Sequence, residues 1–387
     1  MMRVYLDNSA TTRVDPRVIE AMTPFFADRY GNPSSIHSFG REAGVAMQES
    51  RETLARALGA SANEIVFTSG GTESDNIAIQ GFAYANREKG DHIVTSAIEH
   101  HAVLHTCQYL ETQGFRVTYL PVDSEGILSV EALKSAIRSD TILVTVMSVN
   151  NEIGTIQPIR EIGAIARESG AVFHTDAVQA FTKLPIDVDK DNVDMLAISA
   201  HKFHGPKGVG ALFVRSGLKI RPLVYGGGHE MGLRSSTENV SGIVGMGKAT
   251  EISLQSMESD VARMLSLRNR IIDAVLETVP NAYLNGHRQK RLCNNAHFRF
   301  DFIDGESLVL ELDGSGIATS TGSACSTKSR DVSHVLKAIA LRPEMARGSL
   351  RVSLSRMSTR EEADYLIDQI PSAVRKLRAI SPVTSWD

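Results

Sequence analysis

The sequence predicts an α/β protein: a large domain with a mainly parallel sheet sandwiched by helices, followed by a smaller α+β domain at the C-terminus. Two patterns lead to this prediction. In the first two-thirds of the chain, short apolar segments alternate with amphipathic segments of helical period. After about Ser241 the alternation stops, and a long helical stretch leads into a region with strands of its own. A length of 387 residues also favours two domains over a single core.

Six short segments of the first region are predicted strands. They are apolar on both faces and rich in β-branched residues, as expected for strands covered on both sides by helices. These segments are Glu64–Thr68, His92–Ser96, Thr141–Ser148, Ala171–Thr175, Met195–Ser199 and Gly210–Val214. Ligands bind beyond the carboxyl ends of the strands in such sheets, so we expect the functional site there.

The intervening helices have recognisable ends. One is expected to begin at Pro158 and to stop at Gly170, because proline suits the first turn and glycine the C-terminal cap. Another should follow Ser129 as its N-cap. The long stretch Ile243–Val279 is the third, and it leads to the strand candidates of the smaller domain.

Those later strand candidates are His297–Phe302 and Leu350–Leu354. We expect residues 1–15 to form a segment that packs on the small domain. Residues 16–260 would then form the large domain and residues 261–387 the small one.

Composition excludes several classes of protein. Hydrophobic residues make up 42% and charged residues 22% of the chain, as in ordinary globular proteins. The net charge of −4 offers no basic field, so no nucleic acid or membrane partner is expected. No apolar run approaches a membrane span and the N-terminus lacks the pattern of a signal peptide, which makes the cytoplasm the expected location. Three cysteines without a CxxC pair do not suggest a disulfide framework.

Three segments at predicted strand ends carry candidate functional residues. Ser69–Thr72 opens a helix after a strand and suits an anion, although a plain turn is the alternative. Lys202 lies in a turn fixed by glycine and proline and is a candidate nucleophilic amine, whereas most lysines are solvated charges. Asp176 can keep the ring nitrogen of a pyridine cofactor protonated, or can simply cap a helix.

Histidines and cysteines give further candidates. His101 and His105 are four residues apart, but no third ligand follows at a recognisable spacing, so an intrinsic metal site is not expected. Cys325 lies among small polar residues, as an exposed nucleophilic thiol would. Cys107 has the helical spacing of a core residue, and Cys293 has no evident role.

Together these segments resemble the cysteine desulfurases of the nitrogen-fixation and iron–sulfur-assembly type (group I), within the class V aminotransferase family. The resemblance covers essentially the whole chain. The resemblance is carried by seven motifs, which are residues 5–12 (YLDNSATT), 30–35 (YGNPSS), 67–76 (FTSGGTESDN), 149–154 (VNNEIG), 200–208 (AHKFHGPKG), 226–230 (GGGHE) and 320–326 (STGSACS). This family has the fold of type I pyridoxal-phosphate-dependent transferases.

The resemblance implies pyridoxal 5′-phosphate as cofactor and gives roles to the candidates. Lys202 would form the Schiff base, His100 would stack on the ring and act in catalysis, and Asp176 would pair with the ring nitrogen. Further cofactor-binding positions are Gly71, Thr72, Asn151, Gln179, Ser199, His201 and Thr237. Thr237 matches a threonine that the neighbouring subunit donates in this family, which implies a homodimer.

The same resemblance gives the substrate and the route of sulfur. Asn151 and Arg351 would bind the carboxylate of L-cysteine, with Arg351 as a two-point fork. Cys325, on a loop of the small domain, would take the sulfur as a persulfide, release alanine and pass the sulfur to an acceptor such as an iron–sulfur scaffold protein. Cys325 could also ligate a cluster transiently during this transfer.

Small departures from the family pattern occur, including Gly71 where alanine is usual and Ser236 where glycine is usual. Two kinds of rival remain. An aminotransferase or selenocysteine lyase of the same fold would not require a cysteine on a mobile loop. A non-catalytic scaffold would be expected to have lost the lysine or the thiol, and this chain has both.

Overall fold

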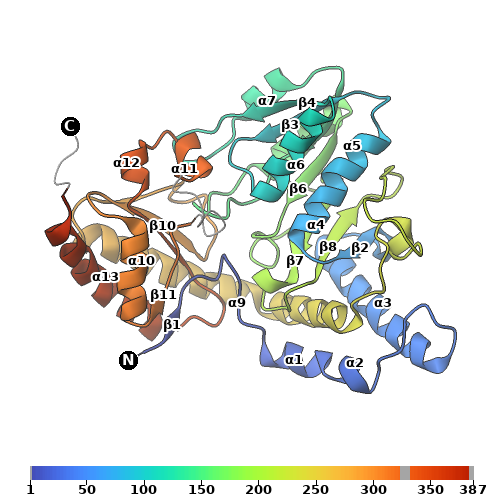
Figure 1. Ribbon diagram of the computed structural model, residues 1–387, viewed down its shortest axis with the longest axis horizontal. Helices are drawn as coiled ribbons and strands as arrows, with labels where there is room; N and C mark the ends of the chain where they lie inside the picture. Colours follow the sequence, from blue (N-terminus) through green and yellow to red (C-terminus); the bar gives the residue numbers. More distant parts are fainter. Residues whose placement is uncertain (1, 323–331, 383–387) are drawn as a thin grey trace.

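The computed structural model describes residues 2–322 and 332–382, which form two lobes. The larger lobe holds a seven-stranded sheet, and the long helix α9 (Val240–Thr278) runs from it into the smaller lobe (Figure 1). The N-terminal part of α9 packs in the core of the larger lobe through Ile243 and Met246, and its C-terminal part packs in the smaller lobe through Ile271 and Val275. One helix therefore belongs to both lobes.

The strands of the larger lobe are β2 (Ile65–Thr68), β3 (His92–Ser96), β4 (Arg116–Leu120), β5 (Thr141–Thr145), β6 (Val172–Asp176), β7 (Met195–Ser199) and β8 (Gly210–Val214). The helices of this lobe are α1 (Pro16–Met22), α2 (Pro24–Ala27), α3 (Ser38–Leu58), α4 (Gly71–Asn76), α5 (Phe82–Ala85), α6 (His101–Thr112), α7 (Val130–Ala136) and α8 (Ile159–Ser169). All six predicted strands are present within three residues of their expected ends. One strand, β4, was not predicted.

The order of strands across the sheet is β2-β8-β7-β6-β5-β3-β4. Neighbours from β7 to β4 run parallel, and only β8 is antiparallel to the strands on either side of it. The prediction of a mainly parallel sheet is confirmed. Because β2 and β7 are both antiparallel to β8, the carboxyl ends of six strands meet at one edge of the sheet.

Alternate residues of each strand enter different cores, which explains why the strands are apolar on both faces. Val94 and Val144 pack under α3, α8 and the start of α9, with Leu54 and Ile162 among their partners in one core. The neighbouring residues Ile93 and Leu143 pack on the other face, in a core with helical residues such as Ile79, Val103 and Leu110. The sheet is thus sandwiched by helices, as the sequence predicts.

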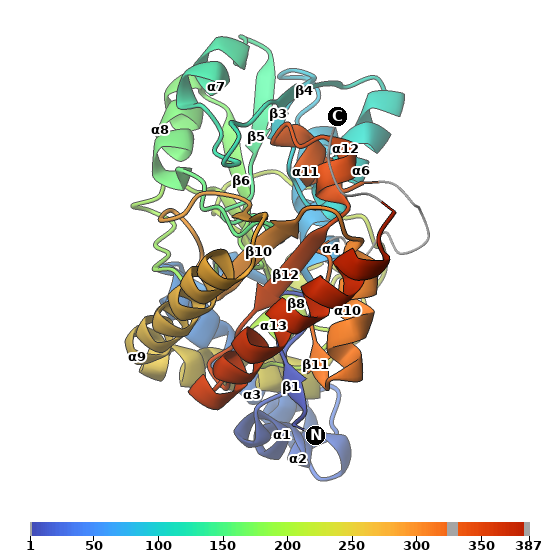
Figure 2. The same cartoon turned by 90° about the vertical axis from the view of Figure 1, so that its left-hand side faces the viewer.

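The smaller lobe contains an antiparallel sheet of order β12-β10-β9, made of β9 (Ala282–Leu284), β10 (Asn295–Phe300) and β12 (Ser349–Ser353). Its helices are α10 (Gly305–Gly314), α11 (His334–Ala338), α12 (Pro343–Ala346) and α13 (Arg360–Ile380). Figure 2 shows α10 and α13 in front of this sheet, and residues of both helices share a hydrophobic core with it.

The first residues of the chain also join the smaller lobe. Strand β1 (Val4–Tyr5) pairs in parallel with β11 (Ile317–Ala318), and Leu6 is fully buried in the core of the small lobe. Asp7 forms an isolated bridge to Ser353 in β12. The exact limits at residues 15 and 260 stay a prediction.

Candidate active site

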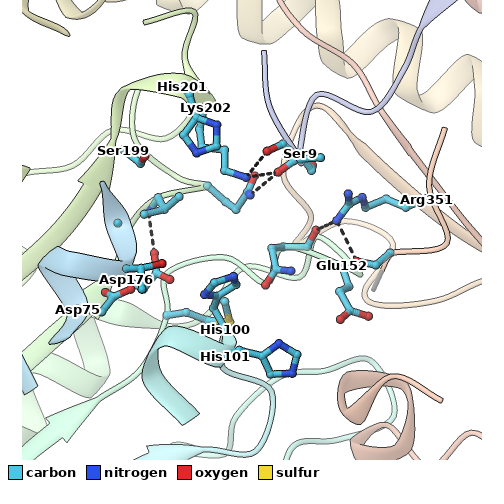
Figure 3. Close-up of a pocket in the computed structure, with 18 of the residues that line it drawn as sticks. Ser9, Asp75, His100, His101, Glu152, Asp176, Ser199, His201, Lys202 and Arg351 are labelled. Carbon is cyan, nitrogen blue, oxygen red and sulfur yellow. Dashed lines mark hydrogen bonds between the residues drawn. The ribbon is translucent and has the colours of Figure 1, made fainter. Parts of the chain in front are cut away.

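A cavity of about 310 Å³ lies at the carboxyl edge of the large sheet, where the smaller lobe meets it. Most of the residues predicted for the site line it, although they come from different elements of both lobes (Figure 3). The predicted residues that line it are Gly71, Thr72, His100, Asn151, Asp176, Gln179, Ser199, His201, Lys202 and Arg351. Its size is within the usual range for a small-molecule site.

Two predicted residues do not line this cavity. Thr237 lies exposed, just before α9, and is not among the lining residues of its own chain. Cys325 lies outside the described residues. Its predicted role and that of Thr237 therefore stay predictions.

Lys202 ends a short 3₁₀ turn, Ala200–Lys202, that follows β7 directly. Its Nζ donates hydrogen bonds to two backbone carbonyls of the N-terminal segment, Ser9 O at 2.5 Å and Ala10 O at 2.8 Å. The side-chain amide of Gln179 donates to the same Ser9 carbonyl at 3.0 Å. The amine is thus held at the wall of the cavity rather than in solvent.

Asp176 is the last residue of β6, and its carboxylate is buried. Its Oδ1 accepts a hydrogen bond from the backbone N–H of Val178 at 2.9 Å, so it also caps the local turn. Burial raises the pKa of Asp176 to about 6, whereas the Val178 hydrogen bond and the nearby Lys202 ammonium act in the opposite direction. A cation next to this carboxylate would therefore stabilise its charged form.

His100 is the N-cap of α6, and its Nδ1 accepts a hydrogen bond from the backbone N–H of Ala102 at 3.1 Å. Burial, followed by the charge of Lys202, lowers the pKa of His100 to about 4. The imidazole is therefore neutral near pH 7 and carries its proton on Nε2. His201, whose Nδ1 lies 3.1 Å from the hydroxyl of Thr11, also has a pKa lowered to about 4, first by burial.

Arg351 projects from β12 of the smaller lobe and is 2% exposed. Its Nη2 pairs with Asp7 Oδ1 at 2.8 Å, and its Nη1 donates to the carbonyls of Asn151 at 2.9 Å and Gly322 at 3.2 Å. Its Nε is buried without a hydrogen-bond partner among the described residues. Arg351 lines the cavity with both terminal nitrogens already engaged, so a substrate carboxylate would have to share or replace the contact with Asp7.

The cavity also contains residues to which the sequence had given no role in it. Asp75 lies beside Asp176 on one wall, and Glu152 lies beside Arg351 on the opposite wall (Figure 3). Glu152 accepts a hydrogen bond from the Ser333 hydroxyl at 2.6 Å, and burial raises its pKa. Both acids are inside motifs of the family resemblance, 67–76 and 149–154, which is the signal that could have identified them.

The two described thiols are buried. Cys107 is fully buried under the large sheet, as predicted, and Cys293 is 5% exposed in the core of the small lobe. Burial raises the pKa of Cys107 well above its ordinary value and that of Cys293 to about 11. Neither thiol has the character of a nucleophile.

His101 stacks on His105 with a centroid distance of 4.8 Å and contacts His334 at 4.9 Å. Within residues 2–322 and 332–382, no group of three or more histidine, cysteine and acidic side chains is arranged to hold a metal ion. In the same part of the chain, every helix is too short or too polar to cross a membrane.

Comparison with known proteins identifies the family of this chain. Residues 4–366 match the family described as aminotransferase class-V. A protein of Methanosarcina thermophila named cysteine desulfurase IscS is 55% identical over 381 residues, which cover 98% of this chain and 94% of that protein. A solved structure described as a NifS-like protein is 42% identical, with a TM-score of 0.92 over 97% of this chain and 100% of that one.

A second solved structure, described as SspA in complex with cysteine, is 39% identical with a TM-score of 0.82, covering 92% of this chain and 100% of that chain. The chain is thus an enzyme of the class-V aminotransferase family, which depends on pyridoxal phosphate. Within that family it belongs to the cysteine desulfurases of the NifS and IscS type.

The described residues fit this cofactor. The cavity offers an amine at Lys202, and it offers a buried carboxylate at Asp176 whose charged form a protonated ring nitrogen would stabilise. Thr72, Ser199 and His201 supply polar groups for a phosphate at the start of α4 and the end of β7. A side chain at Gly71 would meet Val178 Cγ2 at 2.6 Å, so glycine keeps this wall of the cavity open.

Proposed function

We propose that this protein converts L-cysteine to L-alanine and transfers the sulfur through Cys325 to an acceptor used in iron–sulfur cluster assembly. The observation that carries the proposal is that one cavity contains Lys202, Asp176, His100 and Arg351, although these residues are far apart in sequence. The name of the 55% identical relative, cysteine desulfurase, and the cysteine complex of the SspA structure support the same substrate.

Four residues would hold the cofactor by different groups. Lys202 would bind it covalently through Nζ, Asp176 would pair with its ring nitrogen, His100 would lie on its ring, and Gln179 would reach its phenolic oxygen. Gly71, Thr72, Ser199 and His201 would contact its phosphate, and Asn151 would lie at its substrate side. When bound, pyridoxal phosphate supplies an electron sink for bonds that break at the substrate carbon atoms.

The α-proton would be taken by Lys202, with His100 as a hydrogen-bond donor beside it. A lysine amine released from the cofactor would take the α-proton of the substrate, and it would be held in place by the Ser9 and Ala10 carbonyls. His100 is neutral because it is buried, so its Nε2–H can donate a hydrogen bond to charge that develops at the reacting atoms, without transferring its proton. Arg351 and Asn151 would bind the substrate carboxylate and orient the α-carbon.

The sulfur step would use Cys325. Its thiolate would attack the substrate sulfur, so that an S–S bond forms while the C–S bond of the substrate breaks and the carbon fragment leaves as alanine. The two described thiols support this assignment by exclusion, because burial keeps both protonated. Cys325 is the third cysteine of the chain, and its neighbours are small and polar.

We further infer a homodimer in the cytoplasm. Large apolar side chains are exposed in and after α2, including Phe26 at 66%, Tyr30 at 66% and Ile36 at 91%, which is unusual for a surface that stays in water. Thr237 is exposed outside its own cavity, where it would be free to reach a partner's cofactor. Sedimentation should give a dimer, and a fully active monomer would contradict this inference.

The test of the proposed function is to mix the purified protein with pyridoxal phosphate, L-cysteine and a reductant, and to measure alanine and sulfide. Both should form in equal amounts. Cys325→Ala should bind the cofactor but form essentially no alanine. Cys107→Ala and Cys293→Ala are matched controls that should remain active, and alanine suits them better than serine because a hydroxyl would be buried at both sites. Full turnover by Cys325→Ala would return the chain to the wider aminotransferase family.

A further inference from the structure

Beside Asp176 lies a buried polar pair that the proposed function does not use. Asp75, on α4, is 1% exposed, and His174, two residues before Asp176 on β6, is completely buried. Asp75 Oδ1 lies 3.5 Å from His174 Nε2. Each of these two atoms lacks a hydrogen-bond partner among the described residues. Buried polar atoms are rarely left unpaired, so the pair calls for an explanation.

The other ring nitrogen of His174 has a partner. Its Nδ1 lies 2.8 Å from the hydroxyl oxygen of Thr145. When Nδ1 donates its proton to that hydroxyl, Nε2 becomes an acceptor and needs a donor. The Asp75 carboxyl group lies 3.5 Å from Nε2, and it can donate only if it is protonated.

The surrounding charges favour that proton. Asp75 faces Asp176, and the Glu99 carboxyl group adds a third buried acid. The cation that faces Asp176 is Lys202, from the end of β7. Burial, then Asp176, then Glu99 raise the pKa of Asp75 well above its ordinary value. Glu99 is satisfied separately, since it accepts from the Met147 backbone N–H at 2.9 Å and from the Ser96 hydroxyl at 2.5 Å.

We propose that Asp75 is a positioning residue: its carboxyl group is protonated and directs that proton toward His174 Nε2, so that this pair stays neutral and Asp176 alone presents a negative charge to the cofactor ring. This inference rests on the proposed function, because it assumes that Asp176 is the partner of the ring nitrogen. Asp75 acts through Asp176 and is not assigned a contact with substrate.

Asparagine and alanine at position 75 separate the parts of this proposal. Asparagine keeps the shape, the neutral charge and a donor for His174, whereas alanine removes the donor and leaves His174 Nε2 unpaired. The three proteins are purified without cofactor, checked for folding by thermal denaturation, and reconstituted with pyridoxal phosphate. Two properties are then measured: the pH midpoint of the visible absorption band, and the rate of cofactor release on gel filtration.

Asp75→Asn should leave both properties as in the parent protein, because no charge is removed. Asp75→Ala should release the cofactor about tenfold faster, as expected for the loss of one buried hydrogen bond that orders the site. A pH midpoint that moves by about one unit in Asp75→Asn would show that Asp75 is charged and would overturn the proposal. Equal cofactor release by Asp75→Ala and the parent would also overturn it.

Asp176→Asn separates this inference from the proposed function. It should shift the absorption midpoint and weaken cofactor binding, because it removes the charge that faces the ring. If Asp176→Asn changes neither property, the assigned role of Asp176 fails. If Asp176→Asn behaves as expected and Asp75→Ala does not, only the role of Asp75 fails.

Discussion

Replacement of Arg351 separates its structural task from its predicted task in substrate binding. Arg351→Ala removes the partner of Asp7, and the truncation of one member of a buried ion pair costs about 3 to 5 kcal/mol. The lower end of this range applies because the side chain of Asp7 keeps 18% exposure. Loss of cysteine turnover in Arg351→Ala would therefore be ambiguous, because the fold itself is weakened.

Arg351→Lys is the sharper change. Lysine keeps a positive charge for Asp7 but cannot bind a carboxylate with two parallel N–H groups. Hydrogen bonds to charged groups contribute about 1.5 to 3 kcal/mol, so kcat/KM for L-cysteine should fall about 10- to 150-fold. The absorption band of the bound cofactor should be unchanged, because Arg351 lies on the wall opposite Asp176 (Figure 3).

The chain offers a matched control in Arg356. This arginine is also nearly buried and paired with an acid of the N-terminal region, Asp15, at 2.5 Å, but it does not line the cavity. Arg356→Lys should leave alanine formation close to that of the parent. Unchanged kcat/KM in Arg351→Lys, or an equal loss in both lysine variants, would refute the assignment of the carboxylate anchor to Arg351.

Three other predictions follow from the structure. Borohydride reduction of the holoenzyme should fix the cofactor on Lys202, and Lys202→Ala should lose that adduct; mapping of the adduct to another lysine would contradict the assignment. Gly71→Ala should weaken cofactor retention because its Cβ would lie 2.6 Å from Val178 Cγ2, and Val178→Ala should restore retention in the double variant. His297 is fully buried and its pKa is lowered to about 3, so its neutral form stabilises the fold above pH 6.5 and this stability is lost as pH falls. Between pH 7.5 and pH 5, chemical denaturation of the apoprotein should therefore show the parent losing about 2 kcal/mol more than His297→Gln.

The sequence predicted most of the sheet because its inner strands are apolar on both faces. β4 lacks this apolar pattern. It is the edge strand beyond β3, where Arg116 is exposed and the next three residues are only half-buried. β2, at the other edge, is buried at every position, whereas the partly exposed β4 has a pattern that resembles that of a loop. The last residues predicted for β5 leave the regular strand but still donate to the next strand, as Ser148 N does to Asp176 O at 2.9 Å.

Most of the residues that line the cavity could be predicted, because they lie in short motifs at strand ends, whereas Arg351, in the middle of β12, came from the family resemblance alone. The contacts between these residues could not be predicted. Asp75 and His174 are 99 residues apart, and Glu152 and Ser333 are 181 residues apart, so no local spacing joins them. The bonds that link such residues follow from the packing of whole elements, such as α4 on β7 and β8, which a single sequence does not reveal.

The N-terminal segment is an example of such contacts between distant residues, and it joins the two sides of the candidate site. Asp7 holds the guanidinium of Arg351, and two residues later the Ser9 carbonyl holds the amine of Lys202. Ser9 is itself fixed by the hydroxyl of Ser353, which accepts from the Ser9 backbone N–H at 2.8 Å and donates to the Leu6 carbonyl at 3.4 Å. The predicted substrate anchor of the small lobe and the Lys202 amine of the large lobe are thus positioned by one short stretch of chain. Because β1 fixes that stretch to the small lobe, a change in the position of the small lobe would move Asp7 and the Lys202 acceptors together.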